Sequence, residues 1–349
     1  MKVVRYIFLI FILILNSCSK SDYSQFYQKY KTFTKFPVEE DWKLQSFCDD
    51  KFNLQVYLPT IVENKYLVMS DIFNSATEMI RIYDLDSHNC IRAFGIKGQG
   101  PGEFISCTQI SYIDDTLMIY DGTLRRISYY SLKNVLSNKN PLPEKIKKIS
   151  PNAGHATNLC WLTKDTLVAT GIFFKNQLCY YNKNLDTIKT ASKLRNNVMT
   201  EFGKYRFTQT SRIVKNQNKK KFAFVAVQEG DILELYDYAG TIITTLHGPD
   251  LIKPAWIEKK NVFDRISPYN GIASTPYYIY AIYSGVIPGK DWLNAIGKNI
   301  HVFDWDGQPI KKIKSEYRIC DMVYSEQRNT MYTIYFNGEY FKIGFTVLL

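Results

Sequence analysis

Two arginines occupy the same place in neighbouring units of the chain and could together bind an anion. Arg265 lies thirteen residues before the apolar run that begins at Tyr278, and Arg318 lies thirteen residues before the run that begins at Met331. His155 holds nearly the same place in an earlier unit. A guanidinium group binds carboxylate, sulfate or phosphate through charge-assisted hydrogen bonds. The spacing therefore predicts a ring of side chains that takes an acidic ligand.

Two neighbours of these positions, Gln109 and Arg206, complete the set of candidate ligand-binding residues. A second interpretation stays open, in which the arginines pack between structural units or lie exposed. His155 is the histidine for which we predict a place in a site, because it comes just before a strand expected to line a central funnel. The other histidines are expected at the surface or in packing contacts: His88, His247 and His301.

Other catalytic and metal-binding patterns are missing from the sequence. No two histidines have a metal-ligand spacing, and there is no His-Glu-x-x-His, Gly-x-Ser-x-Gly or Cys-x-x-Cys. Residues 304–307 read Asp-Trp-Asp-Gly, but the rest of a twelve-residue calcium loop, including its distal Glu, does not follow. We predict a hairpin turn at this place, no metal and no cofactor.

The first eighteen residues have the features of a targeting signal. A short basic start, an apolar run over residues 6–15 and a small-residue site before Cys18 are typical of a secretory signal. The apolar run is about ten residues long, too short for a bilayer crossing, which needs roughly 20. The residues Leu-Asn-Ser-Cys at 15–18 resemble the lipobox of bacterial lipoproteins. That resemblance implies a diacylglycerol on the Cys18 thiol; an ordinary cleaved signal or an apolar strand are the alternatives.

From this targeting signal we expect a bacterial cell-envelope protein that is held in the outer membrane through its N-terminal lipid. The predicted organisation is a signal peptide over residues 1–17, a lipidated tether over 18–32 and one domain over 33–349. The formal net charge is +11, of which the signal carries two. A basic exported chain favours an acidic glycan, a small anion or a protein as partner, and export argues against nucleic acid. The basic clusters at residues 145–148 and 219–221 are expected to be solvated lysines.

A repeat of about fifty residues organises the chain. Strong apolar strands recur at spacings of 51, 50, 55, 56 and 53 residues, beginning at Tyr66, Leu117, Leu167, Phe222, Tyr278 and Met331. After most of them an alternating strand ends in an aromatic residue and a polar turn, a hairpin signal. Four strands repeated at this period describe a propeller blade. The sequence predicts an all-β fold, a six-bladed β-propeller.

The last unit has too few strands for a full blade. We predict that the segment around residues 35–44 supplies the missing outer strand, so that the N- and C-terminal strands close the ring together. A division into two domains near residues 216–220 is the alternative, but it would break the even spacing. Six cysteines besides Cys18 lie mostly in apolar strands, where buried free thiols are the usual state, and no disulfide can be assigned.

A glycine-rich loop carries the clearest family resemblance. Residues 98–104 read Gly-Gln-Gly-Pro-Gly-Glu-Phe, and an Asp followed by Arg-Ile opens a later strand at Asp121, Arg126 and Ile127. This order resembles the NHL-type repeat and, most of all, the TolB-like six-bladed propeller lipoproteins of Bacteroidetes. The loop is neither Gly-x-Gly-x-x-Gly nor a P-loop. We therefore predict a turn between blades, with Phe104 wedged at the blade contact.

The sequence leaves the activity open among three classes. A binding or scaffolding propeller at the envelope is the main prediction. The alternative is a propeller enzyme, such as a lyase, lactonase or glycan-active hydrolase, with its site in the central funnel. An enzyme of this kind should show several His, Asp or Glu residues converging there, and the sequence offers His155 alone. A structural envelope protein without a small ligand is the third class.

Overall fold

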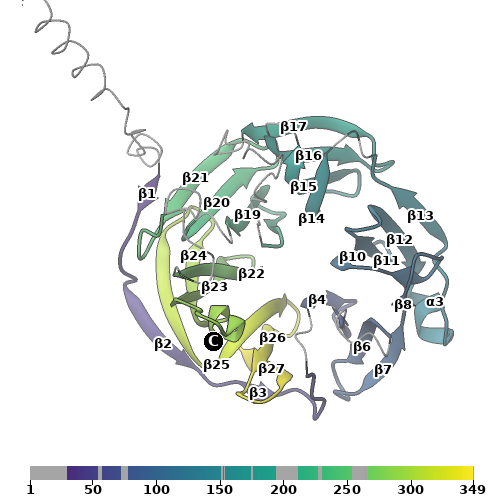
Figure 1. The fold of residues 1–349 in the computed structure, drawn as a ribbon, viewed down its shortest axis with the longest axis horizontal. Helices are drawn as coiled ribbons and strands as arrows, with labels where there is room; N and C mark the ends of the chain where they lie inside the picture. The colour runs from purple at the N-terminus through teal and green to yellow at the C-terminus, as the bar shows by residue number, and fades with distance from the viewer. Residues whose placement is uncertain are drawn as a thin grey trace, which may run out of the picture.

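In the computed structural model, strands form a closed ring (Figure 1). The structure describes residues 30–53, 57–71, 78–150, 152, 154–173, 176–193, 211–226, 230–253, 264 and 266–348. Within these residues the helical elements are short, and no helix is long and apolar enough to cross a membrane. Each unit of the ring, here called a blade, is an antiparallel sheet whose strands follow one another in chain order.

The first three blades are separate four-stranded sheets. Blade 1 contains β4 (Tyr57–Val62), β5 (Tyr66–Ser70), β6 (Ile80–Asp84) and β7 (Cys90–Phe94). Blade 2 contains β10 (Cys107–Ile113), β11 (Thr116–Asp121), β12 (Arg126–Ser131) and β13 (Lys145–Lys148), with helix α3 (Leu132–Ser137) before its last strand. Blade 3 contains β14 (His155–Trp161), β15 (Thr166–Phe173), β16 (Asn176–Asn182) and β17 (Thr187–Lys193).

The other three blades include strands from the N-terminal segment. Blade 4 contains β18 (Val214–Asn216), β19 (Lys221–Ala226), β20 (Ile232–Asp237) and β21 (Ile242–His247). Blade 5 contains β22 (Ser267–Ser274), β23 (Tyr278–Val286), β24 (Gly297–Asp304) and the first half of β25 (Pro309–Ser325), with the 3-10 helix η3 (Trp292–Ala295) before β24. The second half of β25, β26 (Thr330–Phe336), β27 (Phe341–Val347) and β3 (Gln45–Ser46) form blade 6.

Six hydrophobic cores fill the contacts between neighbouring blades, one at each contact. The second strands are buried along nearly their whole length, because a blade lies against each of their faces; all of β5 is buried. Between blades 1 and 2, the rings of Phe94 and Tyr130 meet edge to face at 5.4 Å. Phe104 is fully buried in this core, as predicted. Burial on both faces explains why these strands read as apolar runs.

Ring closure by both ends of the chain is confirmed, but the segment that supplies the outer strand is not the predicted one. β3 lies antiparallel to β27, pairing Gln45 with Phe345 and Ser46 with Gly344. The predicted segment, residues 35–44, instead adds β2 (Val38–Trp42) to blade 5, parallel to β25. It is held there because acidic side chains of β2 face lysines of β25: Glu39 lies 2.7 Å from Lys314.

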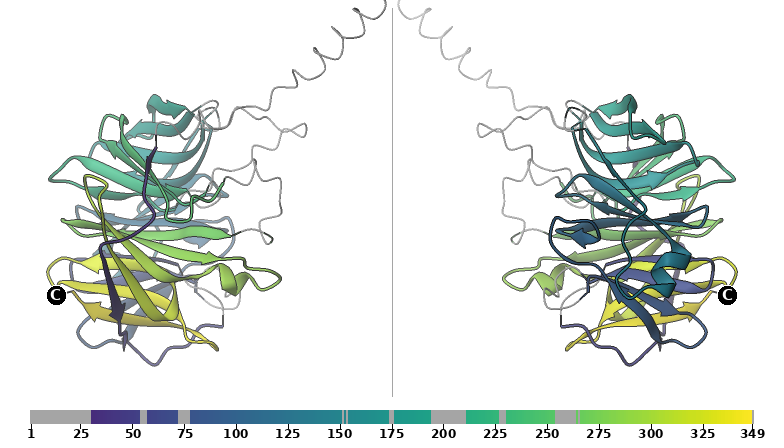
Figure 2. Two further views of the ribbon diagram at one scale, coloured as in Figure 1. Left: turned by 90° about the vertical axis from the view of Figure 1, so that its left-hand side faces the viewer. Right: turned by 90° about the vertical axis from the view of Figure 1, so that its right-hand side faces the viewer.

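The N-terminal strap, residues 31–42, crosses from blade 4 to blade 5 along the outside of the ring (Figures 1 and 2). Its first strand, β1 (Lys31–Thr32), pairs in parallel with β21 of blade 4. These two residues, assigned to the tether from the sequence, are therefore part of the folded domain. Phe33 and Phe36, between β1 and β2, pack against Phe303 of blade 5 at 5.5 and 5.6 Å between ring centroids.

Polar turns after an aromatic residue close the hairpins, as the repeat predicts. In four blades the side-chain oxygen of the turn residue accepts backbone N–H groups at 2.8–3.1 Å: Asp84, Asn182, Asp237 and Asp304. Because the Asp304 carboxylate bonds the backbone of its own turn and Trp305 is fully buried, residues 304–307 form the predicted hairpin.

The glycine-rich loop joins blade 1 to blade 2 and is held by Arg126. The guanidinium of Arg126, 6% exposed, donates to the carbonyl oxygens of Gln99, Gly100 and Glu103, each at 2.7 Å. The Glu103 carboxylate in turn accepts the N–H of Gly100 at 2.7 Å. The carbonyl groups of the loop thus point to Arg126 of blade 2, an arrangement suited to a structural turn.

The two basic clusters are only partly solvated, contrary to expectation. Lys147 donates to the carbonyl of Lys183 in the next blade at 2.6 Å. Lys221 donates to the carbonyl of Trp305 at 2.8 Å and pairs with Asp306 at 2.6 Å. Long lysine side chains at these positions therefore join neighbouring blades. All six cysteines in the described residues are free thiols, four of them buried: Cys107, Cys160, Cys179 and Cys320.

Candidate functional site

The innermost strands of the blades share an irregularity at the centre of the ring. The pairing register shifts between Cys107 and Gln109 in β10, and between Ala156 and Asn158 in β14. Equivalent shifts occur in β4, β22 and the second half of β25. A bulge leaves one residue unpaired and redirects its side chain, and such bulges are common beside functional sites. The central channel is therefore lined by bulges at one level.

An ion pair crosses the centre of the ring at this level. Arg212, just before β18 of blade 4, pairs with Asp321 of blade 6, and the two side chains are 13% and 9% exposed. The Arg212 guanidinium also donates to the carbonyl of Pro59 in blade 1, at 3.0 Å. Asp321 accepts the backbone N–H of Leu58 at 3.0 Å and its other oxygen accepts that of Met322 at 2.9 Å. One pair of side chains thus connects three blades across the ring.

Where the structure describes them, the connections between blades lie on one side of the ring, here called the loop face, which also carries residues 122–125 and 287–296 (Figure 2). Two of the predicted ligand-binding residues lie on innermost strands toward this face. The Gln109 amide donates to the carbonyl of Ile110 at 3.0 Å, and its buried oxygen has no bond to the described residues. Arg318 donates to Asn294 Oδ1 at 2.9 Å and to the carbonyl of Ile296 at 3.3 Å.

The half-exposed Arg318 side chain is therefore anchored on blade 5, as in the packing alternative, but its partners are neutral. No carboxylate among the described residues pairs with it, so its charge is not compensated locally. An anion on the loop face would meet this charge.

His155 begins the innermost strand of blade 3, next to a second arginine. Arg125, in the turn between β11 and β12, donates to the carbonyl of Gly154. Partial burial first, and then the Arg125 charge, lower the pKa of His155. His155 is therefore neutral at pH 7, and a neutral imidazole beside a guanidinium can donate one hydrogen bond and accept another. Arg125 was not among the ligand-binding residues predicted from the sequence.

Three predicted residues lie outside the described part of the chain: Cys18, Arg206 and Arg265. Their roles in lipid attachment and ligand binding stay predictions. Of the predicted ring, the structure places Gln109, His155 and Arg318 on the innermost strands of three different blades.

Comparison with known proteins agrees with this architecture. The family described as TolB-like 6-blade propeller-like matches residues 33–327. The chain belongs to this TolB-like family. Its fold is also similar to that of an exported protein, so described, from Bacteroides fragilis, with a TM-score of 0.57 and 12% identity over 91% of this chain and 100% of that one. It is likewise similar to that of a member of the DUF4221 family from Bacteroides vulgatus, with a TM-score of 0.55 and 10% identity over 88% of this chain and 99% of that one. No curated protein matches.

At these identities the solved structures show the fold alone. The family match and the six cores together confirm the six-bladed propeller predicted from the repeat. The division into two domains is therefore wrong: the residues around 216–220 form the turn between β18 and β19 within blade 4.

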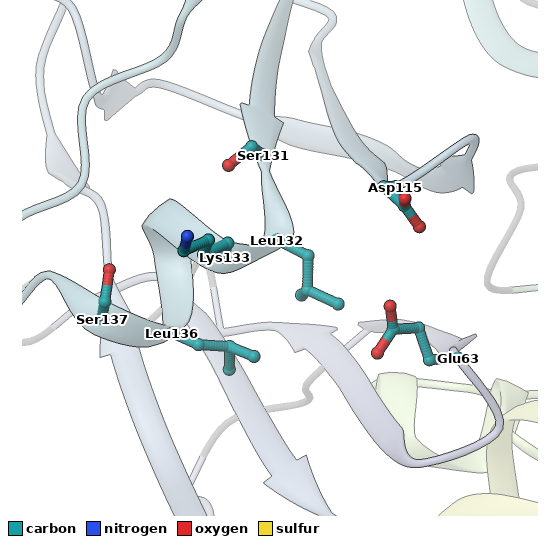
Figure 3. Close-up of a pocket in the computed structure, with 7 residues that line it drawn as sticks. All are labelled: Glu63, Asp115, Ser131, Leu132, Lys133, Leu136 and Ser137. Atoms are coloured by element: carbon teal, nitrogen blue, oxygen red, sulfur yellow. The ribbon is translucent and has the colours of Figure 1, made fainter.

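On the side of this TolB-like propeller opposite the loop face, blades 1 and 2 enclose a hollow of about 540 Å³ (Figure 3). Glu63 and Asp115, in the first turns of the two blades, face Leu132 and Leu136 of α3 across it. The Tyr112 hydroxyl lies 3.0 Å from a carboxylate oxygen of each acid. The hydroxyl has a single proton, so it donates to only one of the two carboxylates at a time. Because Glu63 belongs to blade 1 and Asp115 to blade 2, this hydroxyl connects the two blades.

No group of three or more His, Cys, Asp and Glu residues within the described ranges is arranged to hold a metal ion. The functional residues that sequence reasoning missed are Arg125, Arg212 and Asp321. Alignment of the repeats on their second strands could not find Arg212 and Asp321, because the turns before those strands differ in length from blade to blade. Asp321 lies at the bulge of its strand, whereas β18, which follows Arg212, has a regular register, so no repeated feature marks the two residues together.

Proposed function

We propose that this propeller is an envelope lipoprotein, held in the outer membrane through Cys18, that binds or scaffolds an acidic ligand on its loop face. The single observation that carries this proposal is the uncompensated charge of Arg318, whose guanidinium is held in place by the neutral oxygens of Asn294 and Ile296. A fixed, half-exposed cation near the channel mouth is well suited to a carboxylate or sulfate group.

Binding is favoured over catalysis by the state of the acid at the channel. Asp321 is nearly buried and its oxygens accept two backbone N–H groups and pair with Arg212. Three of its hydrogen-bonding positions are already occupied by groups of the protein itself, so little of this carboxylate is left to contact a substrate. The arrangement supports a rigid recognition surface.

A binding screen of the full-length chain in detergent, against acidic glycans and small carboxylates, tests the proposal. Hydrogen bonds to charged groups contribute about 1.5–3 kcal/mol each, so Arg318→Ala should weaken an acidic ligand about tenfold or more. Arg265→Ala, at the equivalent place in the sequence repeat, should act in the same direction. Arg328→Ala is the matched control, because this arginine lies in the turn between β25 and β26, away from the loop face, and pairs with Asp86.

Equal affinity of all variants for every acidic ligand would remove the arginines from the site. Turnover of a ligand in place of binding would favour the enzyme alternative, and His155 would then be the first residue to replace.

Replacing Cys18 with Ala tests the membrane anchor. We expect the variant to lose metabolic labelling with a radioactive fatty acid and to leave the membrane fraction, because stable residence needs at least two acyl chains on the protein. Cys48→Ala is the matched control, since this thiol lies in the folded domain and is half-buried. Labelling that persists in Cys18→Ala would reject the anchor and leave the binding proposal untouched.

A further inference from the structure

A cavity of about 570 Å³ lies under the N-terminal strap, at the outer contact of blades 4 and 5. This volume falls in the usual range of small-molecule pockets, about 300–1,000 Å³. Aromatic rings form part of its wall: Phe36 of the strap, Tyr283 of β23 and His301 of β24. The His301 ring stacks on Tyr283 at 4.4 Å and lies against Phe36 at 4.5 Å between centroids.

His301 is 1% exposed, and its hydrogen-bond partners favour one tautomer. The Tyr269 hydroxyl donates to the carbonyl of Gly248 at 3.2 Å and also lies 3.0 Å from His301 Nδ1. A carbonyl can only accept, so both contacts are hydrogen bonds at once only when the hydroxyl proton points to Gly248 and Nδ1 carries the hydrogen that joins it to the tyrosine oxygen. Burial, followed by the nearby Lys312 charge, lowers the pKa of His301 to about 3, so the ring is neutral.

The second ring nitrogen of His301, Nε2, is therefore a bare acceptor in a buried side chain at the cavity wall. Among the described residues no donor bonds to it. A ligand hydroxyl that donates to this nitrogen would give it a partner at the cavity wall. A carboxylate, sulfate or phosphate carries only lone pairs on its oxygens and would oppose the lone pair of Nε2.

The remaining polar groups of the wall are mixed and electrically balanced. Lys312 approaches Glu39 at 3.6 Å, and Glu39 is bonded more closely to Lys314. Asp250 accepts the Tyr283 hydroxyl through one oxygen, and its other oxygen has no bond to the described residues. Lys35 supplies the second cation, and the Asn299 amide, which no described residue engages, adds a donor and an acceptor. Two cations and two anions leave no net charge to attract an ion.

We propose that this cavity binds a neutral sugar ring. Each hydroxyl of a sugar both donates and accepts, so neighbouring hydroxyls can donate to His301 Nε2 and Asp250 while accepting from Lys312 and Asn299. The apolar face of the ring can pack on the aromatic wall. The cavity lies at the outer rim and uses none of the loop-face arginines, so this site is independent of the acidic-ligand site.

Isothermal titration of the full-length chain in detergent tests the inference with defined probes. The neutral probes are glucose, galactose and N-acetylglucosamine; glucuronate and glucosamine carry one negative and one positive charge. We expect at least one neutral sugar to bind, and both charged probes to bind more weakly. His301→Phe keeps the stacked ring but removes Nε2, and should weaken the sugar about tenfold, the loss of one hydrogen bond to a buried acceptor.

Two further variants make the result decisive. Asn299→Ala removes a side chain that no described residue engages, so it should fold normally and still weaken the sugar; it decides the case if His301→Phe fails to fold. His88→Phe is the matched control, because His88 also stacks on an aromatic ring, that of Phe47 at 4.5 Å, but at the contact of blades 1 and 6. Its affinity should be unchanged.

The inference is overturned by any of three results. One is that no neutral sugar binds at concentrations up to about 10 mM, in which case water alone satisfies Nε2. Another is tighter binding of glucuronate or glucosamine than of every neutral sugar. The third is a sugar affinity that neither His301→Phe nor Asn299→Ala changes.

Discussion

Removal of residues 338–349 should leave a chain that no longer unfolds in one cooperative transition and that aggregates. The deletion takes away β27, which pairs along its whole length with β26 and, on its other edge, with Gln45 and Ser46. It also removes Phe341 and Ile343 from the core between blades 6 and 1. Loss of one such buried side chain costs about 2–5 kcal/mol, against a typical total stability of 5–15 kcal/mol.

The deletion also opens two edges in the ring. β26 would present its backbone groups to solvent, and β3 would lose its only paired strand in the described chain. Open edges pair with other chains, so we expect larger species in size-exclusion chromatography. A chain that ends at Val347 is the control and should keep a single transition in urea, followed by circular dichroism. An unchanged midpoint for the chain that ends at Asn337 would contradict closure by β27.

The blade count could be read from the sequence because the second strand of each blade is buried on both faces. Runs such as Leu67-Val68-Met69 must then be apolar throughout, and their spacing reports the repeat. The hairpins were readable for a similar local reason, since Asp84 and Asp304 satisfy backbone donors in their own turns. Structural features that are determined by residues close together in the sequence, such as the second strands and the hairpin turns, were therefore predictable.

The strands added by the strap were not predictable in the same way. β2 reads Val-Glu-Glu-Asp-Trp, which is mostly polar; Trp42 is buried, Glu40 is half-buried and the other three residues are exposed. It pairs with blade 5 because Lys311 and Lys314 stand opposite its acids, a complementarity between segments about 270 residues apart. No local pattern in the sequence reports which of two open edges such a strand will choose.

The channel is the second feature that sequence reasoning could not place. The innermost strands of five blades contain a bulge, which shifts the side chains after it by one position and so moves them to another face. The prediction named Arg318, and the structure adds Asp321, three residues later on the same strand, whose side chain pairs with Arg212. The repeat period of the sequence predicts the number of blades, but it does not predict a shift of one residue in the pairing of an innermost strand.

The ion pair at this channel should be among the most sensitive points of the fold. Asp321→Asn keeps an oxygen for the N–H of Leu58 but leaves the Arg212 guanidinium buried without its anion. Arg212→Met keeps most of the side-chain volume and leaves the carboxylate without its cation. Removing one partner of a buried pair costs about 3–5 kcal/mol, so each variant should lower the free energy of unfolding in urea by about that amount.

The double variant, Arg212→Met with Asp321→Asn, separates the ion pair from simple packing. Because neither charge is then left alone, its loss should be smaller than the sum of the single losses by about 0.5–3 kcal/mol. Arg328→Met is the exposed control, since its pair with Asp86 lies at the surface and should contribute at most about 1 kcal/mol. Strictly additive single losses, or single losses no larger than the control, would show that Arg212 and Asp321 do not act as a pair across the channel.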